Sequence, residues 1–183
     1  MKKSVLTALL TCGLAALLHA QKKNEGFHYA IRRATSAIVV DGALDEQAWK
    51  AAAVATDFFM VLPMDTSCAD LRTEVRMAYD DRFLYVSAVN FQPHPVRVES
   101  LRRDWNFGKN DNFIFFMDPF DDQTNGFTFG ANAAGAEWDG QQYDGGTADL
   151  YWENRWYSAV KQHPDRWVFE AAIPFKALRY KKD

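Results

Sequence analysis

Short alternations of apolar and polar residues, divided by turn-forming residues, constrain the fold of this chain more than any other feature of its sequence. In residues 73–79 (TEVRMAY) the larger apolar side chains occupy every second position, which is the period of a half-buried β-strand. A second apolar run, FLYVSAV at residues 83–89, follows the polar turn at residues 80–82. We therefore predict a β-hairpin across these residues.

Other segments of the chain also have the composition of strands. The run FIFFM at residues 113–117 is continuously apolar, which predicts a strand covered on both faces. The extended pattern resumes at residues 127–129, and residues 156–160 and 167–173 are joined by the turn-forming residues HPDR. Because strands recur at short intervals without alternating with helices, we predict an antiparallel β-sandwich of the immunoglobulin or jelly-roll kind.

One helix is predicted among the strands, over residues 44–53. Asp41 stands close before it as a candidate N-cap, and the apolar residues of the segment fall on one helical face. Trp49 lies on that face, so we expect it to fill the core rather than to bind a ligand. A second short helix is expected after Pro174.

The first twenty residues have the composition of a secretory signal peptide. Lys2 and Lys3 precede an apolar run that ends near Ala20 and is too short for an ordinary membrane span. We expect a mature domain of residues 21–183, with no membrane span, to be periplasmic, displayed at the cell surface or secreted. Cys68 would be its only cysteine, which excludes an internal disulfide and predicts a buried thiol.

Charge and motifs argue against two classes of function. The net charge is −3 and both signs are interspersed, so the chain has no basic patch that would neutralise the phosphates of a nucleic acid. Because no H-E-x-x-H, G-x-S-x-G or phosphate-binding loop is present, we do not expect this chain to be catalytic. The remaining candidates for a glycosidase pair are four carboxylates with no fixed separation: Asp139, Asp144, Asp149 and Glu153.

Four motifs in the same order resemble those of carbohydrate-binding module family 9-like domains. They are VDGALDEQAW at residues 40–49, DDRFLYV at 80–86, DNFIFFMDP at 111–119 and RWVFEAAIPF at 166–175. The most similar subgroup is the N-terminal domain of large exported bacterial proteins that carry a β-barrel-like C-terminal region. The resemblance implies a sandwich whose closing strands come after residue 183, so we expect an incomplete domain with an uncovered sheet edge.

The same resemblance implies a binding site for sugar. Related sugar-binding members are expected to clamp a terminal sugar between two tryptophans, beside a Glu, an Arg and an Asn. Trp105 lies close to the first clamp position and Asn132 matches the Asn, so we carry over these two residues. Ile114 stands in place of the Glu and Gly130 in place of the Arg, which removes two hydrogen-bonding groups.

A second candidate groove comes from composition alone. Residues 135–146 are rich in Gly, Asp, Gln and aromatic residues, a mixture suited to sugar recognition through stacking and hydrogen bonds. We therefore add Trp138 to the candidate site, expect it and Trp105 to be exposed in polar loops, and keep Trp152 as an alternative. The competing interpretation is a long hairpin loop whose tryptophans pack at its edge.

Three functions follow from these observations. The first is a non-catalytic carbohydrate-binding domain of an exported protein that takes part in carbohydrate catabolism, with an oligosaccharide or polysaccharide as partner. The second is an assembly domain that docks on a C-terminal β-rich region of a larger envelope protein. The third is a part of a hydrolase that acts on O-glycosyl compounds. No cofactor is expected, apart from a structural calcium ion at Asp118, Asp121 and Asp122, for which a solvated turn is the alternative.

Overall fold

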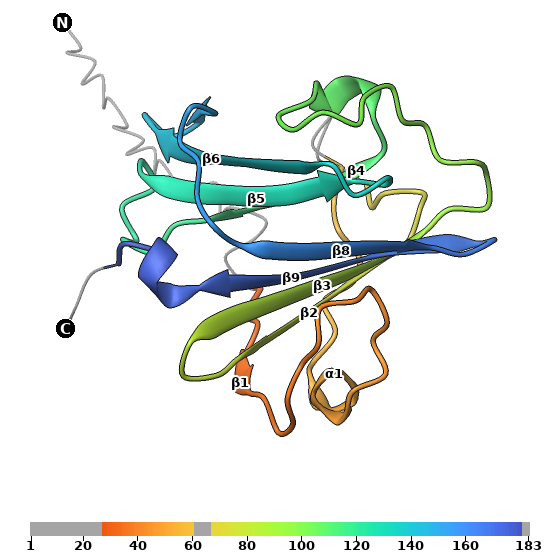
Figure 1. Cartoon of the computed structure of the whole chain (residues 1–183), viewed down its shortest axis with the longest axis horizontal. Coiled ribbons are helices and arrows are strands. Elements are labelled where there is room, and N and C mark those ends of the chain that lie inside the picture. Colours follow the sequence, from red (N-terminus) through yellow and green to blue (C-terminus); the bar gives the residue numbers. More distant parts are fainter. Residues whose placement is uncertain (1–26, 61–66, 181–183) are drawn as a thin grey trace, which may run out of the picture.

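Two facing β-sheets form the molecule, with one short helix on the outside of the larger sheet (Figure 1). The computed structural model describes residues 27–60 and 67–180. The expected signal peptide at residues 1–20 therefore lies outside the described residues. Within the described part of the chain, no helix is both long and apolar enough to cross a membrane.

The larger sheet has the strand order β1-β2-β3-β9-β8 and the smaller sheet β4-β5-β6-β7. All neighbouring strands pair antiparallel, except that β1 pairs parallel to β2. The strands of the larger sheet are β1 (Arg32–Arg33), β2 (Thr73–Tyr79), β3 (Phe83–Phe91), β8 (Tyr157–Gln162) and β9 (Arg166–Pro174). Those of the smaller sheet are β4 (Asn112–Met117), β5 (Gly126–Asn132), β6 (Glu137–Tyr143) and β7 (Thr147–Asp149). The helices are α1 (Gln47–Ala51) and the 3-10 turns η1 (Phe107–Lys109) and η2 (Phe175–Ala177). The predicted sandwich and both predicted hairpins are confirmed.

The main core lies between the two sheets, where alternate residues of β5 and β9 meet. Phe129 and Phe169 are fully buried there, and the ring centroids of Phe113 and Phe169 are 5.3 Å apart. Trp156 packs edge-on against Phe129 with a centroid separation of 5.4 Å. Burial of each such side chain contributes about 1.5–3 kcal/mol, so this aromatic layer supplies much of the stability of the sandwich.

A second, smaller core covers the outer face of the larger sheet. Trp49 from α1 is 1% exposed and packs on Ala78, Tyr85 and Ala172. The expectation that Trp49 fills a core is confirmed. This cluster attaches the N-terminal segment to the sheet.

Glu170 is a fully buried carboxylate at the centre of this attachment. Its Oε1 accepts a hydrogen bond of 2.9 Å from Trp49 Nε1, and its Oε2 accepts bonds of 3.0 and 2.9 Å from the backbone N–H groups of Asp41 and Gly42. Burial raises the pKa of Glu170, and the three hydrogen bonds oppose that rise. Glu170 therefore connects the DG turn and the helix tryptophan to β9.

The helix differs from the prediction in length and in its cap. It spans Gln47–Ala51 rather than residues 44–53, and Glu46 occupies the N-cap position without a side-chain hydrogen bond. The carboxylate of Asp41 instead accepts a bond from Ala43 N within the DG turn, because the helix starts too far along the chain for Asp41 to cap it. The short helix expected after Pro174 is the single 3-10 turn η2.

Two expectations about β4 have different outcomes. Coverage on both faces is wrong, because Phe113 and Phe115 pack against the core while Phe116 is 58% exposed. Among the described residues β4 pairs only with β5, so its other side is an edge of the smaller sheet, while the expected incompleteness of the domain stays a prediction.

Two further expectations are also wrong. Residues 135–146 are not a long loop, since β6 occupies Glu137–Tyr143 and pairs with β5 and β7. Cys68 is exposed rather than buried, because it lies in an isolated bridge with Phe59 outside both sheets.

Candidate functional site

A hollow of about 540 Å³ lies on the outer face of the smaller sheet and is referred to here as the tryptophan hollow. The neighbours of Gly130 in β5, Phe129 and Ala131, face the core, so Gly130 itself faces outward. Trp138 is paired with Gly130 across the strands and therefore faces outward too. The hollow is lined from the loop before β4, from β4 and β6, and from the chain around β7: Asp104, Trp105, Asn106, Phe107, Phe116, Trp138, Gly146, Ala148 and Leu150.

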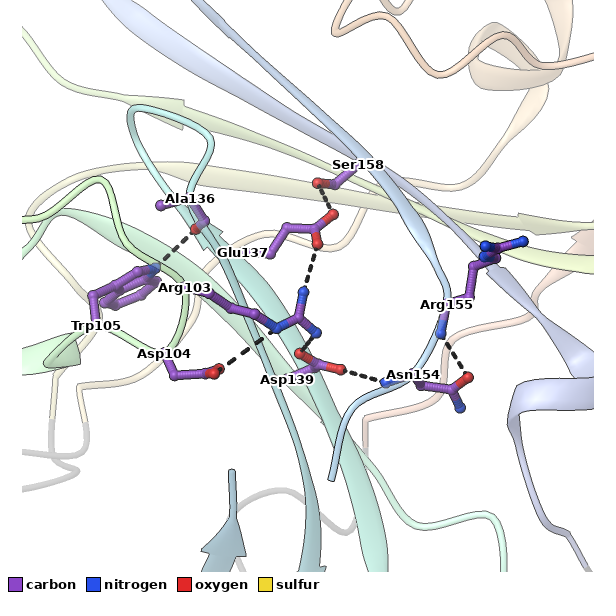
Figure 2. Close-up of polar contacts among 9 residues, drawn as sticks. All are labelled: Arg103, Asp104, Trp105, Ala136, Glu137, Asp139, Asn154, Arg155 and Ser158. Atoms are coloured by element: carbon purple, nitrogen blue, oxygen red, sulfur yellow. Dashed lines mark hydrogen bonds and ion pairs between the residues drawn. The ribbon is translucent and has the colours of Figure 1, made fainter. Parts of the chain in front are cut away.

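The two predicted tryptophans meet at this hollow but are buried in its wall. Trp105 and Trp138 are 4% and 5% exposed, and their ring centroids are 6.5 Å apart at an interplanar angle of 41°. Trp105 Nε1 donates a 2.8 Å hydrogen bond to the carbonyl of Ala136, which holds its ring against the sheet (Figure 2). The expectation that these rings are exposed is wrong, although the structure does bring them together.

The exposed aromatic rings of the hollow are two phenylalanines that the sequence did not single out. Phe107 from η1 is 64% exposed and Phe116 from β4 is 58% exposed. Both also line an adjoining apolar hollow of about 520 Å³, the edge hollow, at the open side of β4. Together with Trp138 they join the two hollows into one aromatic surface. The only sequence signal was the position of Phe116, which alternates with the core-facing Phe115.

Gly130 explains how β4 and β5 come close enough to form this surface. A Cβ atom at residue 130 would lie 2.3 Å from the carbonyl oxygen of Phe113 and 2.8 Å from the Cα of Ile114. Because any side chain there would collide with backbone, glycine is required by packing. The residue therefore has a structural explanation that is independent of ligand binding.

A partly buried ion-pair network, with Asp139 as its one fully buried member, fixes the loop that carries Trp105, as Figure 2 shows. The Arg103 guanidinium donates to Glu137 Oε2 at 2.9 Å and to Asp139 Oδ1, and it lies 3.8 Å from Asp104 Oδ2. Glu137 of β6 is held in turn, since Ser158 Oγ donates a hydrogen bond of 2.9 Å to its Oε1. Arg103 therefore attaches the loop to the edge of β6 and positions Trp105 indirectly.

The two aspartates of this network have raised pKa values. Burial raises the pKa of Asp139 to about 6, with the Arg103 charge and the Asn154 backbone N–H opposing the rise. Burial also raises the pKa of Asp104, against the opposing charge of Arg103. Asp104 is the only charged residue among the described residues that line the tryptophan hollow, and its side chain is 26% exposed. Its carboxyl is therefore the main polar group beside the aromatic surface.

The raised pKa of Asp139 predicts a pH-dependent stability. Between its ordinary value of 3.8 and about 6, the unfolded carboxyl is ionised while the folded one holds a proton. Folding therefore takes up a proton in this window. The contribution of Asp139 to the free energy of unfolding rises by about 2–3 kcal/mol as the pH falls from 6 to 4. We expect Asp139→Asn to remove this part of the pH dependence, measured as the free energy of unfolding at pH 4–8. Identical pH profiles for the two proteins would contradict the prediction.

Comparison with known proteins identifies the family. Residues 40–183 match the family model of carbohydrate family 9 binding domain-like proteins. The chain belongs to this family. No curated protein matches the chain.

Solved structures share the fold of this family 9 domain at low sequence identity. A family 9 carbohydrate-binding module from Caldicellulosiruptor kristjanssonii in complex with glucose has a TM-score of 0.55 and 18% identity, over 79% of this chain and 68% of that module. A family 9 module from the same organism in complex with cellotriose has a TM-score of 0.53 and 19% identity, over 79% of this chain and 66% of that module. A Bacteroides uniformis protein assigned as carbohydrate-binding has a TM-score of 0.61 and 13% identity, over 80% of this chain and 72% of that protein. The domain thus spans about two thirds of the two Caldicellulosiruptor modules.

Asn132 lies away from the lining of the tryptophan hollow. It is fully buried at the end of β5, where its Nδ2 donates 2.7 Å to the Ser100 carbonyl. Its Oδ1 accepts from the backbone N–H groups of Ala134 and Ala136, both at 3.0 Å. These bonds organise the turn that also accepts the Trp105 indole. Sugar contact by Asn132 stays a prediction, whereas its structural role in the family 9 domain is clear.

The other predicted residues of the family 9 domain lie in structural surroundings. Trp152 packs in the core, with its ring 5.1 Å from that of Phe127. Among the predicted carboxylates, Asp139 is paired with Arg103, while Asp149 Oδ1 accepts a turn hydrogen bond from Tyr151 N.

The turn after β4 offers little free coordination to calcium. Both oxygens of Asp118 accept backbone N–H bonds, from Phe120 and Gln123, and Asp122 Oδ1 accepts from the backbone of Thr124 and Asn125. The described residues contain no group of three or more His, Cys, Asp or Glu side chains that could hold a metal ion. These contacts do not favour a calcium site, and calcium binding stays a prediction.

Proposed function

We propose that this family 9 domain is a non-catalytic carbohydrate-binding domain that holds saccharides over the tryptophan hollow. The observation that carries the proposal is the pair of exposed rings, Phe107 and Phe116, beside the buried Trp105–Trp138 pair. Aromatic faces stack on the C–H surfaces of sugars, and a few polar groups then fix orientation. Asp104 supplies such a group, and the glucose and cellotriose complexes of the similar modules support this choice of ligand.

Titration with saccharides tests the proposal through the stacking rings. We expect cello-, xylo- or malto-oligosaccharides to change the tryptophan fluorescence of the intact chain in a saturable way. Phe107→Ala and Phe116→Ala should each weaken binding roughly tenfold, because each removes one stacking face. Tyr180→Ala is the matched control, since this ring is half exposed but does not line either hollow. Binding that is unaffected by both phenylalanine substitutions would contradict the proposed site.

Docking on another protein region is the second candidate function, and the edge hollow favours it. Its apolar lining continues onto the open edge of β4, with Phe58 and Phe107 exposed beside it. Open strand edges are natural sites for pairing with a further strand. If no saccharide of any class binds, the assembly function in a larger envelope protein becomes the better account.

Export and a role in carbohydrate breakdown belong to the same proposal. The sequence of residues 1–20 supports cleavage near Ala20, followed by action outside the cytoplasm. In this setting the domain would deliver a polysaccharide to a hydrolase of O-glycosyl compounds, either in its own parent protein or beside it. Intact-mass measurement of protein recovered from cells should show the loss of about twenty residues. Recovery of only the full-length chain would contradict export.

A further inference from the structure

A third hollow, of about 480 Å³, lies on the outer face of the larger sheet, on the opposite side of the sandwich from the tryptophan hollow. We refer to it as the cationic groove. Its floor is formed by Val89 of β3 and Val168 of β9, which are paired neighbours and only 9% and 5% exposed. The DG turn at Gly42 and the Trp49 ring close one end. The floor of the groove is therefore built on strands.

Four basic side chains from four different elements line this groove: Lys50 of α1, Arg76 of β2, Lys161 of β8 and Arg166 of β9. Against them stand two acidic lining residues, Asp45 and Glu74. The groove is thus net positive, although the whole chain has a net charge of −3.

Among the described residues, the acids near the groove pair with its two arginines and not with its two lysines. Glu74 accepts hydrogen bonds from both Arg72 and Arg76, so one carboxylate faces two guanidinium groups. Arg166 pairs with Asp165 at 2.9 Å, but the Asp165 side chain is 62% exposed and its charge is screened by solvent.

The two lysines remain available to a ligand. Among the described residues neither Lys50 nor Lys161 forms an ion pair. The backbone and Cβ of Lys161 lie against the DG turn, since a Cβ added at Gly42 would lie only 2.9 Å from the Lys161 Cβ. Gly42 has a φ of +78° and is itself fixed by Glu170, so the wall carrying Lys161 is preorganised. A ligand can meet this ammonium group without reordering the backbone.

An apolar floor between cationic walls is complementary to a saccharide that carries carboxylates. The C–H face of a pyranose ring can lie against the partly exposed side chains of Leu44 and Phe91, which line the groove above the valine floor, while its carboxylate reaches Lys50 or Lys161. The volume is within the range of small-molecule sites, which favours a few sugar rings as the ligand. We propose that the cationic groove binds uronate-containing oligosaccharides, as a second site independent of the tryptophan hollow.

Calorimetric titration of the full chain with trigalacturonate tests this site. We expect saturable binding that weakens when sodium chloride is raised from about 20 to 300 mM, because the contacts are between exposed charges. The double variant Lys50→Gln/Lys161→Gln should lower the affinity roughly tenfold, since two charge contacts are lost. Lys176→Gln is the matched control, a lysine on η2 that does not line the groove.

Two further arms separate this inference from the proposed function and from other ligands. Phe107→Ala/Phe116→Ala should leave trigalacturonate binding unchanged, whereas it weakens neutral saccharides at the tryptophan hollow. A short polyglutamate peptide should bind at least tenfold more weakly than trigalacturonate, because it lacks a ring face that can lie on the apolar lining of the groove. The inference is overturned if trigalacturonate does not bind, if its affinity depends on the phenylalanines rather than the lysines, or if polyglutamate binds equally well.

Discussion

Glu170→Ala is expected to lower the free energy of unfolding by about 3 kcal/mol or more. The substitution removes the acceptor of three donors: Trp49 Nε1 and the Gly42 N–H, which are buried, and the Asp41 N–H, which is partly buried. Each buried donor without a partner costs about 1–3 kcal/mol. Part of this loss is offset, because the substitution also removes the unfavourable burial of the Glu170 charge. Urea denaturation monitored by tryptophan fluorescence measures the difference.

Glu170→Gln separates hydrogen bonding from charge at the same position. Glutamine keeps one acceptor oxygen and is uncharged, and burial already raises the pKa of Glu170, so we expect a smaller loss of about 1–2 kcal/mol. Glu153→Ala is the control, because this exposed acid should change stability by no more than about 0.5 kcal/mol. Equal stability of Glu170→Ala and the unsubstituted chain would show that the DG turn and α1 are held by packing alone.

Arg103→Met is the second substitution with a large expected effect. It removes the only cation of the network and leaves Glu137 and Asp139 side by side on β6, with Asp139 only 1% exposed. Breaking a buried pair from one side costs about 3–5 kcal/mol when the remaining charge cannot be neutralised. We expect a loss of about 3 kcal/mol at pH 8 and less at pH 5, where Asp139 can take up a proton.

The same substitution should also release the loop of Trp105. We expect a red shift of tryptophan fluorescence and weaker saccharide binding in Arg103→Met, even at pH 5, where the chain is closer to its normal stability. Arg155→Met is the control, because Arg155 is exposed beside the network and only its backbone N–H makes a contact there (Figure 2). Combining Arg103→Met with Asp139→Asn should recover part of the stability, since the buried charge is then gone. No recovery, together with an unchanged loss at pH 5, would mean that Arg103 acts by packing.

The order and nature of the strands could be predicted because they depend on local patterns. The period-2 alternation of residues 73–79 became β2 with the same bounds, and the turns at residues 80–82 and 163–165 close the two predicted hairpins. Trp49 could be placed in a core because a large indole on a short amphipathic segment has to be covered. Its specific partner, Glu170, is 121 residues away in sequence, and no local pattern connects the two.

The candidate site could be predicted only in part, because it depends on which face of a strand is covered. The structure brings Trp105 and Trp138 to one hollow, but their role in sugar binding stays a prediction. The burial of Trp105 follows from the Arg103 network and from its indole bond to Ala136, neither of which a local pattern reveals. Phe116 was assigned to a covered strand, since a continuous apolar run does not reveal which of its faces stays open.

Local sequence patterns therefore determine where the strands and turns of this chain lie, and they also identify the chain as a member of family 9. Contacts between residues far apart in sequence decide the rest: the buried role of Asn132, the exposed rings of Phe107 and Phe116, and the convergence of Lys50 and Lys161 on one groove. The physical reason is that a strand pattern specifies two faces, whereas solvent exposure depends on what the folded chain places over each face. Binding surfaces belong to that second level, because they consist of the faces that packing leaves open.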